Sequence, residues 1–544
     1  MKKKIIIPGL LALLVIAGIS SCKKDYLNGA NSTVNNTYSA DTVGGSLKAA
    51  SGVPIGMSIG YDFIANTYGD RGTVLREASN VTFGYDMKHG AIVQADGSLN
   101  FTRADALLAN VTAAGLTVHG HTLAWYQNQN GTYLRSLIPG SAGNSVPNLL
   151  LNGDFELGSG SSFTNWNVYN GGTAIGETKV AGEFHGGARA LKIINPADNP
   201  GAQYKVQMVS DLFNTTIGKT YNATIYIKSA TAGGSFRFST MPTASYQGDQ
   251  TTTTSYTQIT WSFTAKDAQT RLSIDIGLKA NTYFIDDMTV TDASLSTPLP
   301  PTAAAAKIDA ELQRFIGGMV NHFKGSVHAW DVVNEPVKDD GNLRAGPYSA
   351  SSDATDTFYW AEYLGRGYIA KAFTYASQAD PTALLFINDY NLEAGSAKVD
   401  SLIKIVNELK AANVPIHGIG TQMHSSINSS YNDIDNMFTK LAATGLKIRI
   451  SELDVKLNPN NKVIDVSSSP TLYNLQADMY KYIIQSYLNH VPAAQRYGIT
   501  VWGQFDKNSW LVTQQKLNDA PLLYDSNGKR KPAYGAVIQA LKGQ

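Results

Sequence analysis

Short apolar runs alternate with amphipathic stretches along two separate parts of this 544-residue chain. In the first part, the runs at residues 53–58, 80–82 and 116–125 indicate buried strands, and residues 103–114 repeat their apolar positions at helical spacing. From residue 308 onward, five more strand-like runs alternate with helical stretches. Eight strands that alternate with helices predict an α/β fold, the (β/α)8 TIM barrel. The later strands are expected at residues 326–335, 383–388, 416–422, 446–452 and 499–503, and the helices at residues 308–323, 363–376, 399–412, 434–443, 476–488 and 533–541.

The helical period disappears between these two parts, from about residue 146 to residue 293. Short alternating runs, such as residues 221–227 and 258–263, are separated there by Gly- and Thr-rich turns, which is typical of a β-sandwich. A segment of about 150 residues is too long for a plain loop in a compact barrel. We therefore predict a jelly-roll sandwich inserted between the third strand and the third helix. The expected domains are residues 48–145 for the first part of the barrel, 146–297 for the sandwich and 298–544 for the rest of the barrel.

The first 22 residues have the pattern of a secretory signal. Lysines at positions 2–4 precede an apolar run at residues 5–19, which is too short and wrongly flanked for a membrane span. The end of this segment, Ile-Ser-Ser-Cys, resembles a bacterial lipobox, in which Cys22 would be acylated. Cys22 is the single cysteine, so no intramolecular disulfide competes for it. We expect an exported lipoprotein on the outer membrane or cell surface, with residues 23–47 as a flexible tether. An ordinary signal with an incidental cysteine is the alternative.

Charge and composition narrow the range of partners. The formal net charge is +1 and 16% of residues are charged, so the chain has no basic field for nucleic acid and no acidic field for cations. We expect a monomer that does not bind nucleic acid. The many Tyr, Asn, Gly and Thr residues suit contacts with sugars, although many exported proteins share this composition.

Two of the strand-like runs end in a glutamate. Residues 326–334 lead into Glu335, and residues 446–451 lead into Glu452. The carboxyl ends of barrel strands meet at one face, so both carboxyls are expected at the mouth of the barrel. Such a pair cleaves glycosidic bonds, one group acting as acid/base and the other as nucleophile or base. Either glutamate alone would suggest a salt-bridged strand end, whereas the pair predicts a polysaccharide hydrolase.

Motifs at the expected strand ends resemble those of family 10 glycoside hydrolases, which are mostly endo-β-1,4-xylanases. The resemblance covers about residues 50–140 and 300–544, and the motifs occur in the family's order. It implies hydrolysis of xylan or arabinoxylan without a cofactor or a catalytic metal. The motifs are GHTLAW at 120–125, WDVVNE at 330–335, NDYN at 388–391, GIGTQMH at 418–424, SELD at 451–454 and WGQFD at 502–506.

The resemblance also implies a role for individual residues. Glu335 matches the general acid/base and Glu452 the nucleophile of a retaining, double-displacement mechanism, in which the two carboxyls lie about 5 Å apart. Asn334 would bond the sugar 2-hydroxyl, and His424 would orient Glu452 with Gln422 beside it. The other substrate-binding residues that the resemblance implies are Lys88, His121, Trp125, Asn128, Trp502 and Trp510.

The chain departs from the family pattern next to the expected sugar-binding residues. Gly84 and Tyr85 stand where the family has Glu-Asn, and Tyr126 and Asn128 stand where it has His and Gln. These positions belong to substrate subsites, so they bear on the preferred glycone sugars and decorations. They leave a retaining β-1,4-glucanase or mixed-linkage glucanase as an alternative. A non-catalytic surface glycan-binding lipoprotein is a further alternative.

The inserted segment resembles carbohydrate-binding modules of families 4, 9 and 22 at its start, residues 148–156, and near its end, residues 283–290. Such a module would hold the polymer near the barrel, and a spacer without binding activity is the alternative. Trp166 is expected in the core. The candidates are Tyr204, Tyr246 and Trp261 for a sugar platform, and Asp154, Glu156 and Asp287 for a structural Ca²⁺.

Overall fold

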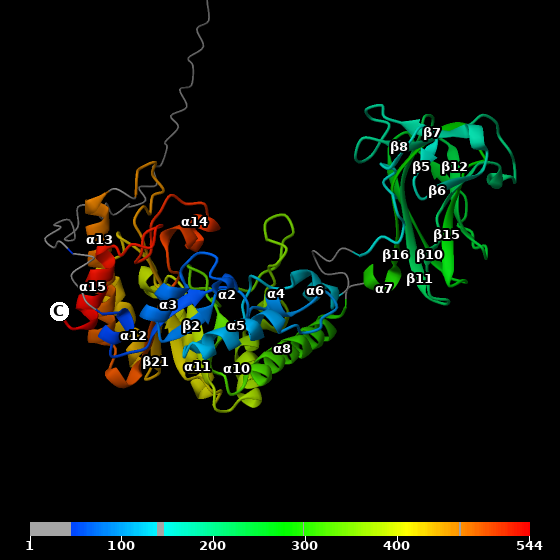
Figure 1. Ribbon diagram of the computed structural model, residues 1–544. Coiled ribbons are helices and arrows are strands. Elements are labelled where there is room, and N and C mark those ends of the chain that lie inside the picture. Colours follow the sequence, from blue (N-terminus) through cyan, green and yellow to red (C-terminus); the bar gives the residue numbers. More distant parts are fainter. Residues whose placement is uncertain (1–37, 39–44, 139–145, 297–298, 467–468) are drawn as a thin grey trace, which may run out of the picture.

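The computed structural model describes residue 38 and residues 45–138, 146–296, 299–466 and 469–544 (Figure 1). The expected signal segment, its Cys22 and most of the expected tether lie outside the described residues. Among the described residues, no helix combines the length and the apolar content needed to cross a membrane.

Parallel strands form a closed barrel, as the alternation of apolar runs predicts. The neighbours follow the order β19-β18-β17-β3-β2-β1-β22-β21, and the β19–β21 pairing closes the ring. A short strand, β20 (His424–Ser426), extends the same sheet by pairing with β21. The predicted (β/α)8 fold with an insertion is confirmed. The barrel strands are β1 (Ile55–Ile59), β2 (Asn80–Phe83), β3 (Thr117–Ala124), β17 (Val327–Asn334), β18 (Leu384–Asp389), β19 (Gly418–Thr421), β21 (Lys447–Lys456) and β22 (Arg496–Val501).

Helices cover the outside of the barrel and bury one face each. In α8, the buried positions include Ile308, Leu312, Phe315 and Met319, which recur at the spacing of one helical face. Each such side chain contributes about 1.5–3 kcal/mol when it leaves water. The principal helices are α3 (Arg71–Glu77), α5 (Thr102–Ala113), α8 (Pro301–Phe323), α10 (Tyr368–Ala379), α11 (Ser396–Ala411), α12 (Tyr431–Ala443), α13 (Pro470–His490) and α15 (Pro532–Leu541). Shorter helices are α1 (Leu47–Ala50), α2 (Asp62–Ala65), α4 (His89–Ile92), α6 (Gly131–Ser136), α7 (Ala293–Ser296), α9 (Trp360–Leu364) and α14 (Trp510–Thr513).

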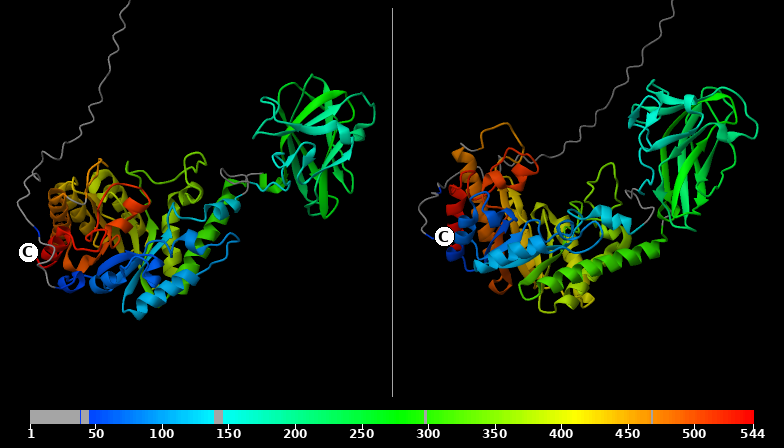
Figure 2. Two further views of the ribbon diagram at one scale, coloured as in Figure 1. Left: turned by 45° about the horizontal axis from the view of Figure 1, so that its top comes forward. Right: turned by 45° about the vertical axis from the view of Figure 1, so that its right-hand side comes forward.

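The segment between α6 and α8 folds as an antiparallel β-sandwich, a separate body in Figure 2. One sheet has the order β13-β12-β15-β9-β6-β5-β4, with β10 paired to β15, and the other has the order β14-β11-β16-β8-β7. The sandwich packs around its own apolar core, distinct from that of the barrel. Its strands are β4 (Gly158–Ser159), β5 (Ser162–Phe163), β6 (Trp166–Asn170), β7 (Ile175–Thr178), β8 (Ala190–Asn195), β9 (Gln207–Ser210), β10 (Phe213–Asn214), β11 (Thr220–Ser229), β12 (Gly234–Met241), β13 (Gln250–Thr252), β14 (Thr257–Thr264), β15 (Gln269–Asp275) and β16 (Asn281–Asp292).

The aromatic candidates of the sandwich separate into core and surface residues. Trp166 is buried, and its indole N–H donates to the Asn152 carbonyl at 3.0 Å, so its predicted place in the core is confirmed. Trp261 is partly buried and packs one side against the same core, so its role as a sugar platform stays a prediction. Tyr204 and Tyr246 are exposed, and they remain candidates for the same role.

The carboxylates proposed for calcium have other partners. Glu156 accepts hydrogen bonds from the backbone N–H groups of Ala188 and Arg189, and Asp287 lies 2.6 Å from His185 Nδ1. Among the described residues, no group of three or more His, Cys, Asp or Glu side chains is placed to hold a metal ion. Calcium binding, which would also involve Asp154, stays a prediction.

Candidate active site

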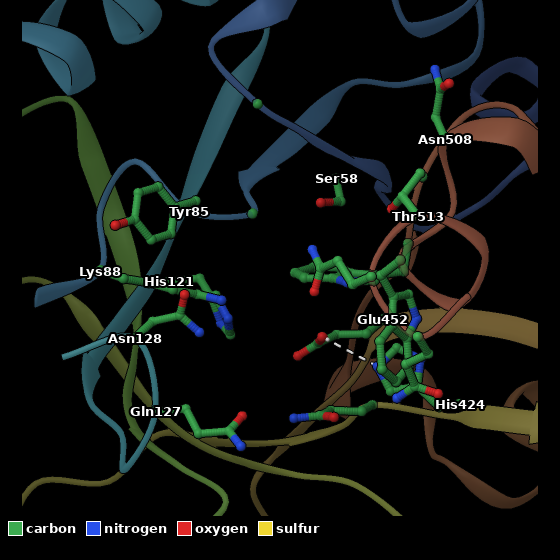
Figure 3. A pocket seen from close by; sticks show the side chains of 18 of the residues that line it. Ser58, Tyr85, Lys88, His121, Gln127, Asn128, His424, Glu452, Asn508 and Thr513 are labelled. Carbon is green, nitrogen blue, oxygen red and sulfur yellow. Dashed lines mark ion pairs between the residues drawn. The ribbon is translucent and has the colours of Figure 1, made fainter. Parts of the chain in front are cut away.

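A cleft of about 880 Å³ opens at the carboxyl ends of the barrel strands (Figure 3). Every residue that the sequence suggests for catalysis or substrate binding lines it. In Figure 3, Tyr85, Lys88, His121 and Asn128 lie on one side of the cleft, and Glu452 and His424 lie opposite them. The suggested residues are Lys88, His121, Trp125, Asn128, Asn334, Glu335, Gln422, His424, Glu452, Trp502 and Trp510.

Glu335 follows the last residue of β17 in a left-handed backbone conformation, with φ of 52°. This conformation costs of order 1–3 kcal/mol for a residue other than glycine, so the surroundings must hold it. The Glu335 N–H donates to the Asn388 carbonyl at 2.8 Å, and Arg344 Nε donates to the Glu335 carbonyl at 3.1 Å. The side-chain Oε1 accepts from Asn334 Nδ2 at 3.1 Å and from Gln422 Nε2 at 3.0 Å.

Glu452 lies within β21 and is buried. Its Oε1 accepts a hydrogen bond from Asn388 Nδ2 at 2.9 Å, and its Oε2 lies 3.4 Å from His424 Nε2. Burial alone would raise the pKa of Glu452, but the hydrogen bond from His424 and the charges of His121, His424 and Lys88 outweigh it and lower the pKa. Glu452 is therefore held ionised.

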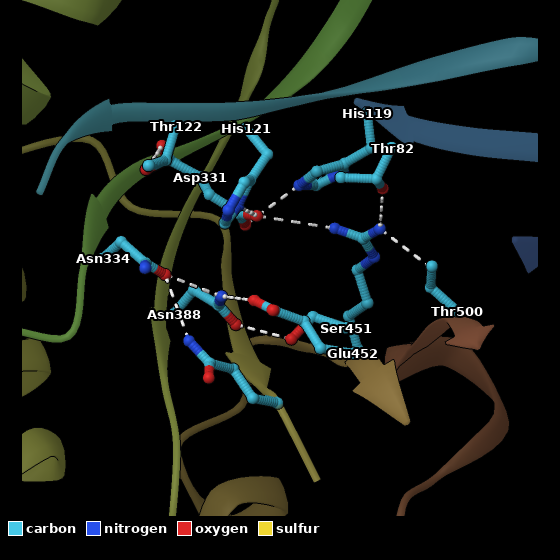
Figure 4. Close-up of polar contacts among 12 residues, drawn as sticks. Thr82, His119, His121, Thr122, Asp331, Asn334, Asn388, Ser451, Glu452 and Thr500 are labelled. Carbon is cyan, nitrogen blue, oxygen red and sulfur yellow. Dashed lines mark hydrogen bonds and ion pairs between the residues drawn. The ribbon is translucent and has the colours of Figure 1, made fainter. Parts of the chain in front are cut away.

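Asn388, at the carboxyl end of β18, lies between Asn334 and Glu452 (Figure 4). Its Nδ2 donates to Asn334 Oδ1 at 2.8 Å as well as to Glu452, and its Oδ1 accepts from Ser451 Oγ at 2.6 Å. Since Asn334 in turn donates to Glu335, two amides fix both carboxylates in one network. The sequence assigned Asn388 to a motif but predicted no role for it; its place at a strand end was the available signal.

His424 is held by a second carboxylate, Asp454. Asp454 Oδ2 lies 2.9 Å from His424 Nδ1 and accepts a hydrogen bond from Trp510 Nε1 at 2.9 Å. Burial would lower the pKa of His424, but the charges of Asp454 and Glu452 outweigh it and raise that pKa to about 10. The histidine is therefore a cation at neutral pH. Asp454 was also missed, although its position two residues after Glu452 places both side chains on the same face of the strand.

A buried ionic cluster lies beneath the cleft. Asp331 Oδ2 is 3.0 Å from His121 Nδ1, and its Oδ1 is 2.9 Å from His119 Nε2. Arg449 donates to Thr82 Oγ1 at 2.7 Å, and its Nη1 lies 3.6 Å from Asp331. Figure 4 shows Asp331, His119 and Thr82 of this cluster. Burial would raise the pKa of Asp331, but His119, His121 and Arg449 hold it well below its usual range. The contact with Asp331 leaves Nε2 of His121 available to the cleft.

Lys88 is buried in the wall of the cleft, with Nζ 4.4 Å from the centre of the Trp125 ring. Burial lowers its pKa to about 8, and the charges of Glu452 and Glu335 partly offset this effect. Lys88 therefore changes charge close to neutral pH.

Gln422 lies between the two glutamates. Its main-chain carbonyl accepts from the Glu452 N–H at 3.0 Å, which agrees with its expected place beside Glu452, and its side-chain amide donates to Glu335. The residues that depart from the family pattern, Gly84, Tyr85 and Tyr126, line the same cleft. A Cβ at Gly84 would lie 3.2 Å from Ser58 Oγ, so a side chain at this position would crowd the end of β1.

Comparison with protein families identifies this fold and cleft. Residues 45–148 and 295–540 match the model of glycosyl hydrolase family 10, and together they make up more than half of the chain. The chain belongs to glycosyl hydrolase family 10. The residues between the two matched segments, 149–294, form the β-sandwich.

Among the relatives of this chain, endo-1,4-beta-xylanase A of Cellvibrio japonicus (strain Ueda107) is 40% identical over 253 residues, which cover 44% of this chain and 41% of the relative. Endo-1,4-beta-xylanase A of Thermoanaerobacterium saccharolyticum is 38% identical over 264 residues, 46% of this chain and 20% of the relative. The chain thus spans less than half the length of these two relatives.

Solved structures share the fold. The structure of a GH10 protein from Paenibacillus barcinonensis has a TM-score of 0.55 at 20% identity, covering 90% of this chain and 95% of that chain. A thermostable mutant of a xylanase (Xyn10A) from Cellvibrio japonicus has a TM-score of 0.53 at 24% identity, covering 92% and 100%.

Proposed function

We propose that the protein is a retaining endo-β-1,4-xylanase that hydrolyses xylan or arabinoxylan. The observation that carries the proposal is the pair of Glu335 and Glu452 in the cleft of a family 10 barrel. The side-chain amides of Asn334 and Asn388 join the two carboxylates by hydrogen bonds. The names of the relatives described above support xylan as the substrate.

In the first step, the Glu452 carboxylate attacks the anomeric carbon while the bond to the leaving sugar oxygen breaks. Glu335 gives its proton to that oxygen. The covalent sugar ester on Glu452 is the intermediate, and ionisation of Glu452 by its cationic neighbours prepares the attack.

In the second step, Glu335, now ionised, takes a proton from water, and the water oxygen attacks the same carbon. The bond to Glu452 breaks and its carboxylate is restored. Two inversions leave the configuration unchanged. Asn334 would bond the sugar 2-hydroxyl, and Trp502 and Trp510 would form the aromatic wall.

A β-1,4-glucanase is the second candidate function. A relative named Exoglucanase XynX, from Acetivibrio thermocellus, is 38% identical over 264 residues, which cover 46% of this chain and 22% of the relative. Gly84 lines the cleft without a side chain, which would leave room for the larger sugar of a glucan.

Reducing-sugar release from arabinoxylan, with carboxymethyl-cellulose in parallel, tests these functions on protein that begins after Cys22. We expect release of reducing sugar from arabinoxylan. The first product that NMR detects should have the same anomeric configuration as the bond cleaved in the substrate. Glu452→Ala should show no measurable turnover. Binding of the polymer by this variant should persist. Release from the cellulose derivative alone would favour the glucanase, and wild-type turnover by Glu452→Ala would refute the mechanism.

We propose further that the sandwich binds the polymer. Its resemblance to carbohydrate-binding modules and two exposed aromatic residues, Tyr204 and Tyr246, support this role. Tyr246 also lies under Arg237, whose guanidinium carbon is 4.6 Å from the ring centre. Affinity electrophoresis of the isolated segment in xylan tests the proposal, and unretarded migration would contradict it.

We propose that a lipid on Cys22 anchors the enzyme to a membrane as an exported, monomeric lipoprotein. The charge pattern and lipobox of residues 2–22 support this proposal. Labelling with a radioactive fatty acid should mark the wild type and not Cys22→Ser. Equal labelling of both would contradict it.

A further inference from the structure

A second cavity, of about 260 Å³, adjoins the catalytic cleft. Tyr85 and Asn128 line both cavities, so the smaller one forms a side pocket of the cleft. Tyr85 and Asn128 are also positions at which the chain departs from the family pattern. The side pocket is much smaller than the cleft, so it suits one sugar unit and not a further stretch of polymer.

The backbone around the side pocket is closely packed. A Cβ at Gly90 would lie 2.8 Å from the Asn128 carbonyl oxygen, and one at Gly131 would lie 2.4 Å from the Thr355 carbonyl oxygen. The Asn128 N–H donates to Asp356 Oδ2 at 3.1 Å, in a residue whose φ is 51°. The pocket is therefore shaped by fixed main chain and not by mobile side chains alone.

The lining offers a hydrogen-bond acceptor for hydroxyl groups. Gln129 is 4% exposed and its Nε2 donates to the Gln127 carbonyl at 3.0 Å, whereas its Oε1 has no hydrogen-bond partner among the described residues. That oxygen is itself buried, so a ligand in the side pocket does not reach it. The acceptor that the lining offers is the Asp356 carboxylate, and the half-exposed ring of Tyr85 provides an apolar surface.

The charge of the lining selects against an acidic ligand. Asp356 carries the only formal charge among the described residues that line the side pocket, and it is negative. Arg103 does not line this pocket; it pairs with Asp86 at 3.1 Å and stacks on Tyr61. A uronic acid would bring a second carboxylate beside Asp356. Arg135 lies behind the pocket wall, where its guanidinium donates to the Thr355 and Thr357 carbonyls, and it does not line the pocket.

We propose that the side pocket binds a single neutral pentosyl branch of the polysaccharide, carried by the backbone sugar that lies against Lys88 and Asn128. The proposal rests on the proposed xylanase function and adds a decoration that the enzyme prefers. Branch hydroxyls would donate to the Asp356 carboxylate, with the branch ring against Tyr85.

The test compares kcat/KM on three purified xylo-oligosaccharides of equal backbone length: unbranched, with one arabinofuranosyl branch and with one glucuronyl branch. We expect the arabinofuranosyl compound to be cleaved at least tenfold more efficiently than the glucuronyl compound, at one bond fixed relative to the branch. Equal rates, or random cleavage around the arabinofuranosyl branch, would overturn the proposal while leaving the xylanase function intact. Failure to cleave any of the three would overturn both.

Two variants locate the branch. Thr132 is exposed, lines the side pocket and is absent from the cleft wall, so Thr132→Tyr should fill the pocket. It should lower kcat/KM for the arabinofuranosyl compound at least tenfold relative to that for the unbranched one. Thr471→Tyr, at an exposed site in α13 that lines neither cavity, should leave this ratio unchanged. The same ratio in Thr132→Tyr and in the wild type would place the branch elsewhere.

Asp356→Asn removes the charge and keeps an oxygen that can accept from the Asn128 N–H. We expect it to raise kcat/KM for the glucuronyl compound at least threefold. An unchanged value would show that Asp356 does not exclude acidic branches, and it would refute that part of the proposal.

Discussion

The two glutamates of the site have different surroundings, although both follow similar strand-like runs. Within the described residues, the hydrogen bonds to the Glu335 carboxylate come from the neutral amides of Asn334 and Gln422. Glu452 instead faces the His424 cation and lies in the field of Lys88. One carboxyl can therefore exchange a proton with the substrate while the other stays charged.

Because His424 is protonated in the folded protein, the site contributes stability that depends on pH. Its pKa is about 10 when folded and near 6.5 when unfolded, so this contribution is complete below pH 6.5 and is lost as pH rises to 10. We expect the stability advantage of wild type over His424→Gln to fall across this window by up to about 1.4 kcal/mol per pH unit.

Calorimetric Tm values of the barrel transition at pH 6, 7, 8 and 9 measure this effect. His490→Gln is the matched control, because His490 pairs with Asp435 at 3.4 Å on the surface. A Tm difference between wild type and His424→Gln that stays constant with pH would refute the argument.

Lys88 should set the alkaline limit of activity. It is charged below about pH 8, where it supports the ionised Glu452, and neutral above that pH. We expect kcat/KM, which reports the free enzyme, to fall above pH 8 in the wild type. Lys88→Met should lose at least tenfold in kcat/KM at pH 6 and should lack this alkaline limb. Lys404→Met, at an exposed position of α11, is the control. If kcat/KM of Lys88→Met still falls above pH 8 as in the wild type, another group is responsible for the alkaline limit.

The sequence predicted which residues line the cleft and that His424 meets Glu452, but it did not predict the amide hydrogen bonds. Glu335 and Glu452 could be found because strand ends in a barrel share one face. The partners of Asn388 and Gln422 could not be found, because they depend on which side-chain rotamers of three neighbouring strands meet. The functions of the subsite residues stay predictions.

At the scale of elements, close contact between β18 and β19 positions the central amide. Gly420 pairs with Asn388 in the sheet, and a Cβ at Gly420 would lie 2.2 Å from Asn388 Oδ1. Gly420→Ala should displace Asn388 and weaken its hydrogen bonds to Asn334 and Glu452. We expect kcat to fall at least tenfold while the fold is retained by circular dichroism.

A matched control for Gly420→Ala is Gly317→Ala, since a Cβ at Gly317 meets nothing within 4 Å. Gly317 lies within α8, where alanine is favoured over glycine by about 0.5–1 kcal/mol. Gly317→Ala should therefore keep kcat and should not lower Tm. Wild-type kcat in Gly420→Ala would show that Asn388 need not stay in place.

Most barrel elements lie within a few residues of their predicted positions, because long periodic segments carry a strong signal. The clearest misses are two helix starts: α8, predicted from residue 308 and found from Pro301, and α13, predicted from residue 476 and found from Pro470. Ser469 caps α13 by accepting from the Leu472 N–H, and proline is well suited to the first helical position. The apolar positions of α13 recur at helical spacing only after its first turns, so the sequence pattern placed its start too late. The short strands β4, β5 and β10 have two residues each, too few for a pattern.

At the scale of the molecule, the sandwich begins and ends at one place. The Leu149 N–H donates to the Val290 carbonyl at 2.8 Å, and Asn148 Nδ2 donates to the Met288 carbonyl at 3.0 Å. Its first and last segments are therefore neighbours, so the barrel chain can leave and return without spreading α6 and α8 apart. Separate apolar cores make each unit a candidate for independent folding.

Removal of residues 146–296 tests this division. Because the barrel core contains no sandwich residue, we expect the shortened enzyme to fold and to hydrolyse unbranched soluble oligosaccharides within about threefold of the wild-type kcat/KM. On insoluble xylan, its rate should fall by about tenfold or more, since tethering raises the local concentration of substrate. Tyr204→Ala combined with Tyr246→Ala in the full chain should reproduce the loss on insoluble xylan alone. If the shortened enzyme retains full activity on insoluble xylan, the sandwich is a spacer; if it loses activity on soluble substrates, the two units depend on each other.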